Sequence, residues 1–185
     1  MPGLRVIRPA DANETAAAWK LAIELPGPSA LVFSRQNLPV LDQAERIHDG
    51  VPRGAYVLVD SVGAPEVILI GTGSEVSLAV EAASTLTNEG IRVRVVSMPS
   101  WEVFEAQPAS YRESVLPAAV HARVAVEAGV SMGWGRYVGE SGAFIGIEHF
   151  GASAPGSLLF KEFGITAQAV VDHAQQVLER VRERA

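Results

Sequence analysis

EVILIGTGSEVSLAVEAASTLTNEGIRVRVVSMPS, residues 66–100, is the stretch that decides the fold class of this chain. It begins with an apolar run (66–73), continues with a helical pattern that stops at Gly90, and ends in a β-branched run (91–100). A strand, a helix and a second strand in this order form a βαβ unit, whose strands lie parallel. Parallel sheets need cover on both faces, so the pattern predicts an α/β fold.

The N-terminal region repeats this alternation. Residues 4–9 and 30–34 read as strands and flank a helical pattern over residues 11–25. Asp11 is a good N-cap, and Glu14 is placed to reach back to the free amides of the first turn. We therefore predict a partial βαβ unit ahead of the main sheet.

Strand and helix patterns continue through the rest of the chain. Residues 55–61 and 66–73 flank the turn VGAP and predict an antiparallel hairpin, whose first strand forms the edge of the sheet. Further strands are predicted at 122–129 and 144–148, and a C-terminal amphipathic helix is predicted after a cap at Thr166. The predicted fold is α/β, with a mostly parallel sheet, one antiparallel edge strand and helices on both faces.

Residues 36–53 interrupt the alternation. This segment, QNLPVLDQAERIHDGVPR, is polar and contains Pro39, Gly50 and Pro52. We interpret it as an irregular linker between two parts of the chain.

The composition is that of a folded globular chain, with 48% hydrophobic and 19% charged residues. The net charge is -6 and the 15 lysines and arginines are spread thinly, so we expect no nucleic-acid binding. Cysteine is absent, which excludes disulfides, thiolate nucleophiles and Cys-ligated metals. The apolar runs are too short for a membrane span, and these features together predict a soluble, cytoplasmic protein with no membrane partner.

The turn GTGSE, residues 71–75, is a candidate anion site, because a strand, a glycine-rich turn and a helix N-terminus together present free amides. It lacks the third glycine of the dinucleotide fingerprint and the Gly-Lys-Ser/Thr of a phosphate loop. The other interpretation is structural: Gly71 and Gly73 allow a tight turn, and Thr72 or Ser74 caps the helix. The sequence favours the structural interpretation.

The histidines and the SMGWGRYVG segment (131–139) carry weaker signals. No two of the four histidines, which are His48, His121, His149 and His173, have the spacing of metal ligands on one helix face. We expect His173 to be solvated, and His121 and His149, at strand ends, to have ordinary hydrogen-bonding roles. Trp134 and Tyr137 lie among three glycines, a pattern more typical of a packed irregular connection than of a binding loop.

Arg35, in SRQNLP, combines position with chemistry. It follows the predicted strand 30–34, and ligands of α/β sheets bind at the carboxyl ends of parallel strands. Its guanidinium suits bidentate binding of a phosphate or a carboxylate. The alternative is a salt bridge to Asp42 or Glu45 that fixes the following segment. The residues alone leave both roles open.

Seven segments, in their order and spacing, resemble the C-terminal third of transketolase. They are LRVIRPADANETAAAWKLAIE (4–24), GPSALVFSRQNLP (27–39), GTGSEVSLAVEAA (71–83), IRVRVVSMPS (91–100), YRESVLP (111–117), ARVAVEAG (122–129) and HFGASAP (149–155). Related thiamine diphosphate enzymes share the architecture, but they are not expected to carry SRQNLP and YRESVLP together.

This resemblance implies a division of the chain and one site residue. Residues 1–35 would be the last strand-helix-strand unit of the pyrimidine-binding domain, residues 36–53 a linker, and residues 54–185 the C-terminal domain. Arg35 matches the family arginine that binds the phosphate of the sugar phosphate substrate. No catalytic, cofactor-binding or metal-binding residue of the family matches a position in this sequence.

The resemblance also implies a reaction. Transketolases transfer a two-carbon ketol unit from a ketose phosphate to an aldose phosphate in the pentose phosphate pathway. They use thiamine diphosphate with a divalent metal, Mg or Ca, and the full-length enzymes are homodimers. The family motifs that hold the cofactor belong upstream of Met1, so we expect a fragment that alone binds no cofactor and is inactive.

Two further expectations accompany this reading. Two parallel strands alone leave apolar faces uncovered, so residues 1–35 should pack on the rest of the chain or on a second copy. The alternative function is a standalone α/β binding or regulatory module with an anion site at Gly71–Glu75.

Overall fold

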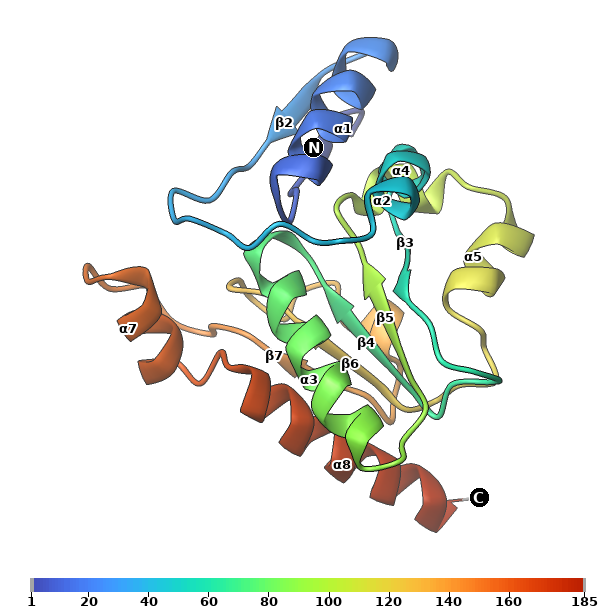
Figure 1. Ribbon diagram of the computed structural model, residues 1–185. Helices are drawn as coiled ribbons and strands as arrows, with labels where there is room; N and C mark the ends of the chain where they lie inside the picture. The colour runs from blue at the N-terminus through green and yellow to red at the C-terminus, as the bar shows by residue number, and fades with distance from the viewer. Residues whose placement is uncertain (1, 185) are drawn as a thin grey trace.

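The computed structural model describes residues 2–184 and comprises a small N-terminal unit and a larger α/β unit (Figure 1). The N-terminal unit consists of β1 (Arg5–Ile7), α1 (Ala12–Glu24) and β2 (Ser29–Leu31). β1 and β2 pair in parallel, which confirms the predicted βαβ unit.

The start of α1 follows the predicted capping pattern. The Asp11 carboxylate accepts a hydrogen bond from the Glu14 amide at 2.8 Å. The Glu14 carboxylate in turn accepts from the Ala10 amide at 2.7 Å. Two amides that the helix itself cannot satisfy are thus paired at its first turn.

The larger unit is built on a five-stranded sheet. Its strands are β3 (Tyr56–Val59), β4 (Val67–Gly71), β5 (Val93–Ser97), β6 (Arg123–Val126) and β7 (Ala143–Ile145). The strand order is β3-β5-β4-β6-β7, and only the pairing of β3 with β5 is antiparallel. The mostly parallel sheet with one antiparallel edge strand is therefore confirmed.

The predicted hairpin between residues 55–61 and 66–73 is wrong. β3 and β4 follow each other in the chain, but β5 lies between them in the sheet. Every residue of β4 is buried, because β5 and β6 flank it and helices cover both faces. The connection through the following helix returns β5 to the side of β4, and β3 can pair only with the outer edge of β5.

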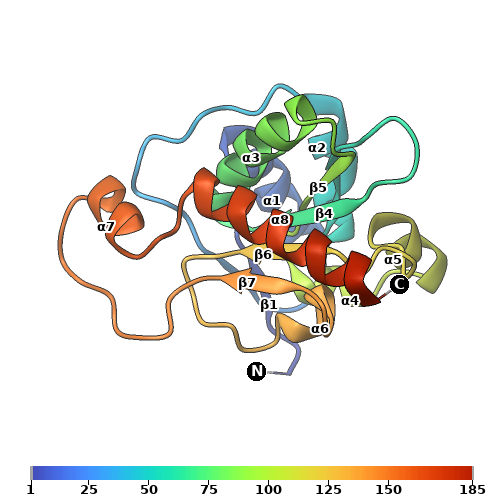
Figure 2. The same ribbon diagram turned by 90° about the horizontal axis from the view of Figure 1, so that it is seen from below.

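Helices cover both faces of this sheet. They are α3 (Val76–Asn88), α4 (Trp101–Glu105), α5 (Ala109–Val115), α6 (Gly135–Val138) and α8 (Ala167–Arg184), with a short 3-10 turn, η2 (Gly73–Glu75), before α3. A further helix, α7 (Gly156–Glu162), has no buried residue and projects away from the sheet (Figure 2). α3 and α8 pack together over one face, and Figure 2 shows α8 crossing β6 and β7. Within residues 2–184, no helix has both the length and the apolar composition needed to cross a bilayer.

The opposite face is covered by an aromatic cluster around Trp134. This side chain is fully buried, and its ring centroid lies 5.1 Å from that of Trp101 and 5.8 Å from that of Phe144. Tyr137, on α6, is also buried in the cluster. The glycine-rich segment 131–139 is therefore a packed connection, as the sequence favoured.

The segment 36–53 is not irregular throughout. It contains α2 (Ala44–Gly50) and a 3-10 turn, η1 (Val51–Arg53). Ile47 and Val51, four residues apart, are buried, and α2 packs against α1 and β3. Gly50 and Pro52 obscure this apolar pair in the sequence, although proline is tolerated at the start of a helical turn because its missing amide would be unpaired there.

The N-terminal unit packs on the α/β unit of the same chain, which is one of the two arrangements expected; the other was packing on a second copy. The Arg8 amide donates to the Pro99 carbonyl at 2.8 Å, and the Gly73 amide donates to the Arg8 carbonyl at 3.1 Å. These bonds fix the end of β1 to the carboxyl ends of β4 and β5. Figure 1 shows the N-terminal unit, in blue, on this side of the sheet.

Candidate functional site

Arg35 lies four residues beyond the end of β2, at the carboxyl side of this strand. Its side chain is exposed. The ion pairs found within residues 2–184 do not include Arg35, so neither Asp42 nor Glu45 holds it. The salt-bridge alternative has no support in the structure, and the guanidinium faces solvent.

The segment that carries Arg35 lies beside the loop that leads into α7. A Cβ atom at Gly156 would lie only 2.7 Å from the side-chain nitrogen of Gln36, so the two segments approach closely where residue 156 has no side chain. Figures 1 and 2 both show this part of the chain next to α7. In the same loop, the His149 ring stacks edge-on against Phe163 at 4.9 Å, and Phe150 is almost fully exposed.

A cavity of about 210 Å³ lies at the carboxyl ends of β4, β5 and β6. We call it the β4–β6 crevice; it is lined by Val6, Arg8, Thr72, Met98, Pro99, Trp101, Glu102 and Glu127. The chain leaves β4 toward β5 on one side and leaves β6 toward β7 on the other. The crevice is thus the topological switch point of the sheet, the usual place for a ligand in an α/β fold.

Arg8 extends from the N-terminal unit and forms part of the wall of the β4–β6 crevice. Its Nη1 forms an ion pair with Glu127 Oε1, and its Nη2 lies 3.8 Å from Glu75 Oε2. The second oxygen of Glu127 accepts a hydrogen bond from Trp134 Nε1 at 2.6 Å. The Ala128 amide donates to Glu75 Oε1 at 3.1 Å. One guanidinium therefore faces two carboxylates, each held by a donor of the α/β unit.

Burial sets the electrostatics of this cluster. The Glu75 side chain is 1% exposed, and burial raises the pKa of its carboxyl group, an effect that the Arg8 guanidinium partly offsets. Glu75 Oε2 has no hydrogen-bond donor among the described residues. The crevice is therefore an acidic site that favours a cation.

The GTGSE turn has the structural role that the sequence favoured. The Gly73 amide, which an anion would need, donates instead to the Arg8 carbonyl. A Cβ at Gly71 would lie 2.8 Å from the Cα of Val76, so this tight turn requires glycine. No side-chain cap from Thr72 or Ser74 is present, contrary to our expectation. The buried Glu75 would repel an anion here, so the anion-site alternative is not supported.

Two family models match the chain. Residues 54–166, more than half of its length, match the transketolase-like C-terminal domain. The chain belongs to the transketolase family. Residues 1–40 match the transketolase pyrimidine-binding domain.

Known transketolases are similar along almost the whole chain. The transketolase of Halalkalibacterium halodurans is 57% identical over 97% of this chain. The structure of the Leishmania mexicana transketolase is 48% identical over 97% of the chain, with a TM-score of 0.90. That of the Pichia stipitis transketolase in complex with sedoheptulose 7-phosphate is 38% identical over 98%, with a TM-score of 0.88. The chain spans 27% of the first of these proteins and 26% of each of the others.

Thiamine diphosphate, the cofactor of the transketolase family, does not fit a site made from the described residues alone. Within residues 2–184, no group of three or more His, Asp or Glu side chains could hold a metal ion. The neighbouring carboxylates of Glu75 and Glu127 already face Arg8. We therefore derive no reaction step through the cofactor from this chain.

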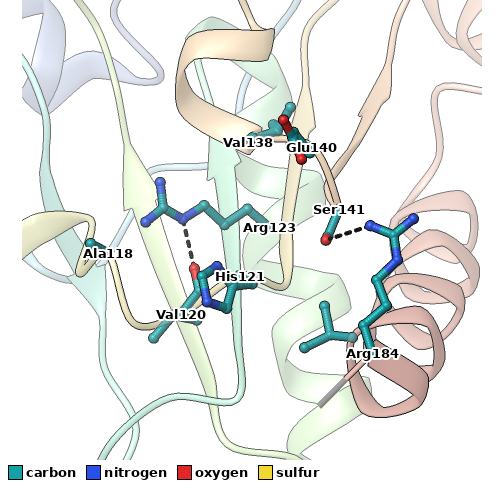
Figure 3. Close-up of a pocket in the computed structure, with 10 residues that line it drawn as sticks. Ala118, Val120, His121, Arg123, Val138, Glu140, Ser141 and Arg184 are labelled. Atoms are coloured by element: carbon teal, nitrogen blue, oxygen red, sulfur yellow. Dashed lines mark hydrogen bonds between the residues drawn. The ribbon is translucent and has the colours of Figure 1, made fainter.

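A second cavity, of about 700 Å³, lies on the opposite edge of the sheet, at the amino ends of β6 and β7 (Figure 3). Arg123 and Arg184 both line it, but their guanidinium groups point to different sides. Arg184 donates to Ser141 Oγ at 3.3 Å. Arg123 donates to four carbonyl groups, those of Leu116, Pro117, Val120 and Tyr137. Arg123 is thus committed to the fold, and the cavity is far from Arg35 in this transketolase chain.

The sequence reasoning placed Arg35 at a strand end but missed the cluster of Arg8, Glu75 and Glu127. Two signals were available. Glu75 is part of the GTGSE motif, and Glu127 lies in the predicted strand 122–129 and directly follows the observed β6. Both positions lie at carboxyl ends of parallel strands, where such side chains converge.

Proposed function

We propose that this chain forms the C-terminal part of a transketolase, which transfers a two-carbon ketol unit from a ketose phosphate to an aldose phosphate in the pentose phosphate pathway. The observation that carries the proposal is the match of two transketolase models in succession, to residues 1–40 and 54–166. The complete enzyme would be a cytoplasmic homodimer that uses thiamine diphosphate with Mg or Ca. Thiamine diphosphate acts as the electron sink when the carbon–carbon bond breaks.

The division of the chain is part of this proposal. Residues 1–35 would complete the pyrimidine-binding domain, residues 36–53 would connect it to the next domain, and residues 54–185 would form the C-terminal domain. The ranges of the two family models support this division. The packing of α2 against α1 and β3 means that the connection is ordered and contributes to the interface between the two parts.

Arg35 is the residue that we assign to the substrate. Its exposed guanidinium, its place beyond the carboxyl end of β2 and the absence of an ion pair to Asp42 or Glu45 all support a role in binding the phosphate group of the sugar. A guanidinium binds phosphate through two parallel, charge-assisted hydrogen bonds. The Pichia stipitis relative was solved with a sugar phosphate, which has this group.

Replacing Arg35 with alanine in the complete enzyme tests this assignment. Losing a charge-assisted hydrogen bond costs about 1.5–3 kcal/mol, so kcat/KM for phosphorylated sugars should fall roughly 10- to 150-fold. Unphosphorylated ketoses should be affected far less. Arg180→Ala, which removes an exposed arginine on α8, is the matched control and should leave both rates unchanged. An unchanged preference for phosphorylated sugars in Arg35→Ala would refute the assignment.

A further inference from the structure

We propose that Glu75 and Glu127, beside the β4–β6 crevice, form a guanidinium-binding site of the α/β unit, and that Arg8 of the N-terminal unit is the ligand that occupies it. The receptor consists of the carboxylates of Glu75 and Glu127. This proposal does not depend on the transfer reaction, because it concerns how the two units of the chain recognise each other.

The geometry suits a planar cation with several donors. Nη1 and Nη2 of Arg8 face different carboxylates, Glu127 and Glu75. A Cβ at Gly73 would lie 3.4 Å from Arg8 Nη2, so the guanidinium group lies against a turn that has no side chain. A lysine has a single compact ammonium group and could not direct two separate nitrogen donors at the two carboxylates.

The carboxylates are held in place within the α/β unit itself. Trp134 Nε1 donates to Glu127, and the Ala128 amide donates to Glu75. Neither donor belongs to the N-terminal unit. The donors that orient the two carboxylates thus belong to the α/β unit, and the arginine comes from a segment distant in sequence.

The charge in the crevice favours a cation and opposes an anion. Three acids, Glu75, Glu102 and Glu127, lie in or next to it, and Arg8 is the only basic side chain among its lining residues. Glu102 accepts a hydrogen bond from the Val6 amide. The buried Oε2 of Glu75 is the oxygen that has no hydrogen-bond donor, and it faces the guanidinium. Without Arg8, the buried Glu75 carboxylate and the partly buried Glu127 carboxylate would lack a counter-ion, which is costly.

Chemical rescue of Arg8→Ala in the 185-residue chain tests the site. Guanidinium chloride is titrated through the low millimolar range, far below denaturing concentrations. The thermal midpoint and the indole proton resonance of Trp134, one of only three tryptophans, are followed. Because Trp134 donates to Glu127, this resonance reports directly on the receptor. We expect guanidinium to raise the midpoint saturably and to return the resonance toward its wild-type position.

Controls separate specific binding from general effects. Sodium chloride and urea at the same concentrations should not rescue Arg8→Ala, and guanidinium should not stabilise the wild type, whose site is filled. Adding Glu127→Gln should abolish the rescue, whereas adding Glu66→Gln, which affects an acid paired with Arg92 and Arg182 outside the crevice, should preserve it.

Two results would overturn the proposal. One is rescue by inorganic phosphate instead of guanidinium, which would mean that the crevice binds anions. The other is equal rescue by guanidinium and sodium chloride, which would mean that Arg8 contributes only nonspecific charge. If Arg8→Ala does not fold in buffer, the same comparison is made on the yield of refolded chain in the presence of each salt. A greater yield with guanidinium is then expected, and equal yields would contradict the site.

Discussion

A single buried carboxylate, that of Glu14, joins the two units of the chain. It has no exposed surface, and it accepts hydrogen bonds from the Tyr56 hydroxyl at 2.7 Å and from the Ser97 hydroxyl, as well as from the Ala10 amide. Tyr56 lies on β3 and Ser97 on β5, so this side chain of α1 reaches into the main sheet. Burial raises the pKa of Glu14, and the hydrogen bonds counteract part of that rise.

We predict that Glu14→Gln lowers the free energy of unfolding by about 1–3 kcal/mol under mildly acidic conditions. The side-chain amide keeps the shape of the carboxyl group, but its NH₂ must face another donor, either the Ala10 amide or the two hydroxyls. Denaturant unfolding measures the change. Glu24→Gln, on the exposed part of the same helix, is the control and should change stability by less than about 0.5 kcal/mol.

The pH dependence of this difference follows from the pKa shift of Glu14. Its pKa in the folded chain lies above the ordinary value of 4.5, so the folded chain binds the proton more tightly than the unfolded chain does. The stabilisation is therefore complete below pH 4.5 and is lost as the pH rises through the raised folded pKa. We expect the stability advantage of the wild type over Glu14→Gln to shrink as the pH rises from 4.5 toward neutrality. An advantage that grows with pH would contradict this assignment.

At the scale of elements, α2 shows that the connection between the two units is a packed part of the fold. Ile47 is 1% exposed and lies four residues from the fully buried Val51. We predict that Ile47→Ala costs roughly 2–5 kcal/mol, because it removes a buried side chain and leaves a cavity. Glu45→Ala, on the exposed side of the same helix, should stay within about 0.5 kcal/mol of the wild type. A flexible linker would show no difference between the two variants in denaturant unfolding.

The existence and type of most elements could be predicted from the sequence, but their pairing could not. The apolar run of β4 and the periodicity of α3 are local signals, and both elements were expected. The partner of β3 depends on where β5 returns, which no local pattern encodes. On α3, Leu86 is buried whereas the adjacent Thr87 is exposed, because neighbouring elements decide which face of the helix is covered.

The candidate sites also differ in how far local sequence could locate them. Arg35 could be located because a strand end and a guanidinium are both visible locally. Arg8, Glu75 and Glu127 come from three distant segments, and each has an ordinary local environment in the sequence. Only the arrangement of the N-terminal unit across the carboxyl ends of β4 and β6 brings their charges together. The sequence offered an anion site there, and the structure places acids instead.

At the scale of the whole molecule, the N-terminal unit is anchored on one side and exposed on the other. Trp19 and Ile23 of α1 are 53% and 79% exposed, and Phe33, whose ring centroid lies 6.2 Å from that of Trp19, is 45% exposed. A parallel sheet of two strands rarely stands alone, because both of its faces need cover. The α/β unit, to which Arg8 and Glu14 are bonded, covers the N-terminal unit on one side only. These features fit a unit that belongs to a larger domain, as its match to the pyrimidine-binding domain indicates.

The last prediction concerns the activity of this chain when the rest of a transketolase is absent. The 185-residue chain alone should neither bind thiamine diphosphate nor show transketolase activity, because its described residues offer the exposed Arg35 but no group of metal-binding side chains. Calorimetry with thiamine diphosphate and magnesium should give no heat of binding, and a coupled assay with a ketose phosphate and an aldose phosphate should stay at background. A complete transketolase, assayed with the same substrates, is the positive control. Turnover above background that is lost in Arg35→Ala would disprove the prediction and would place the chemistry within this chain.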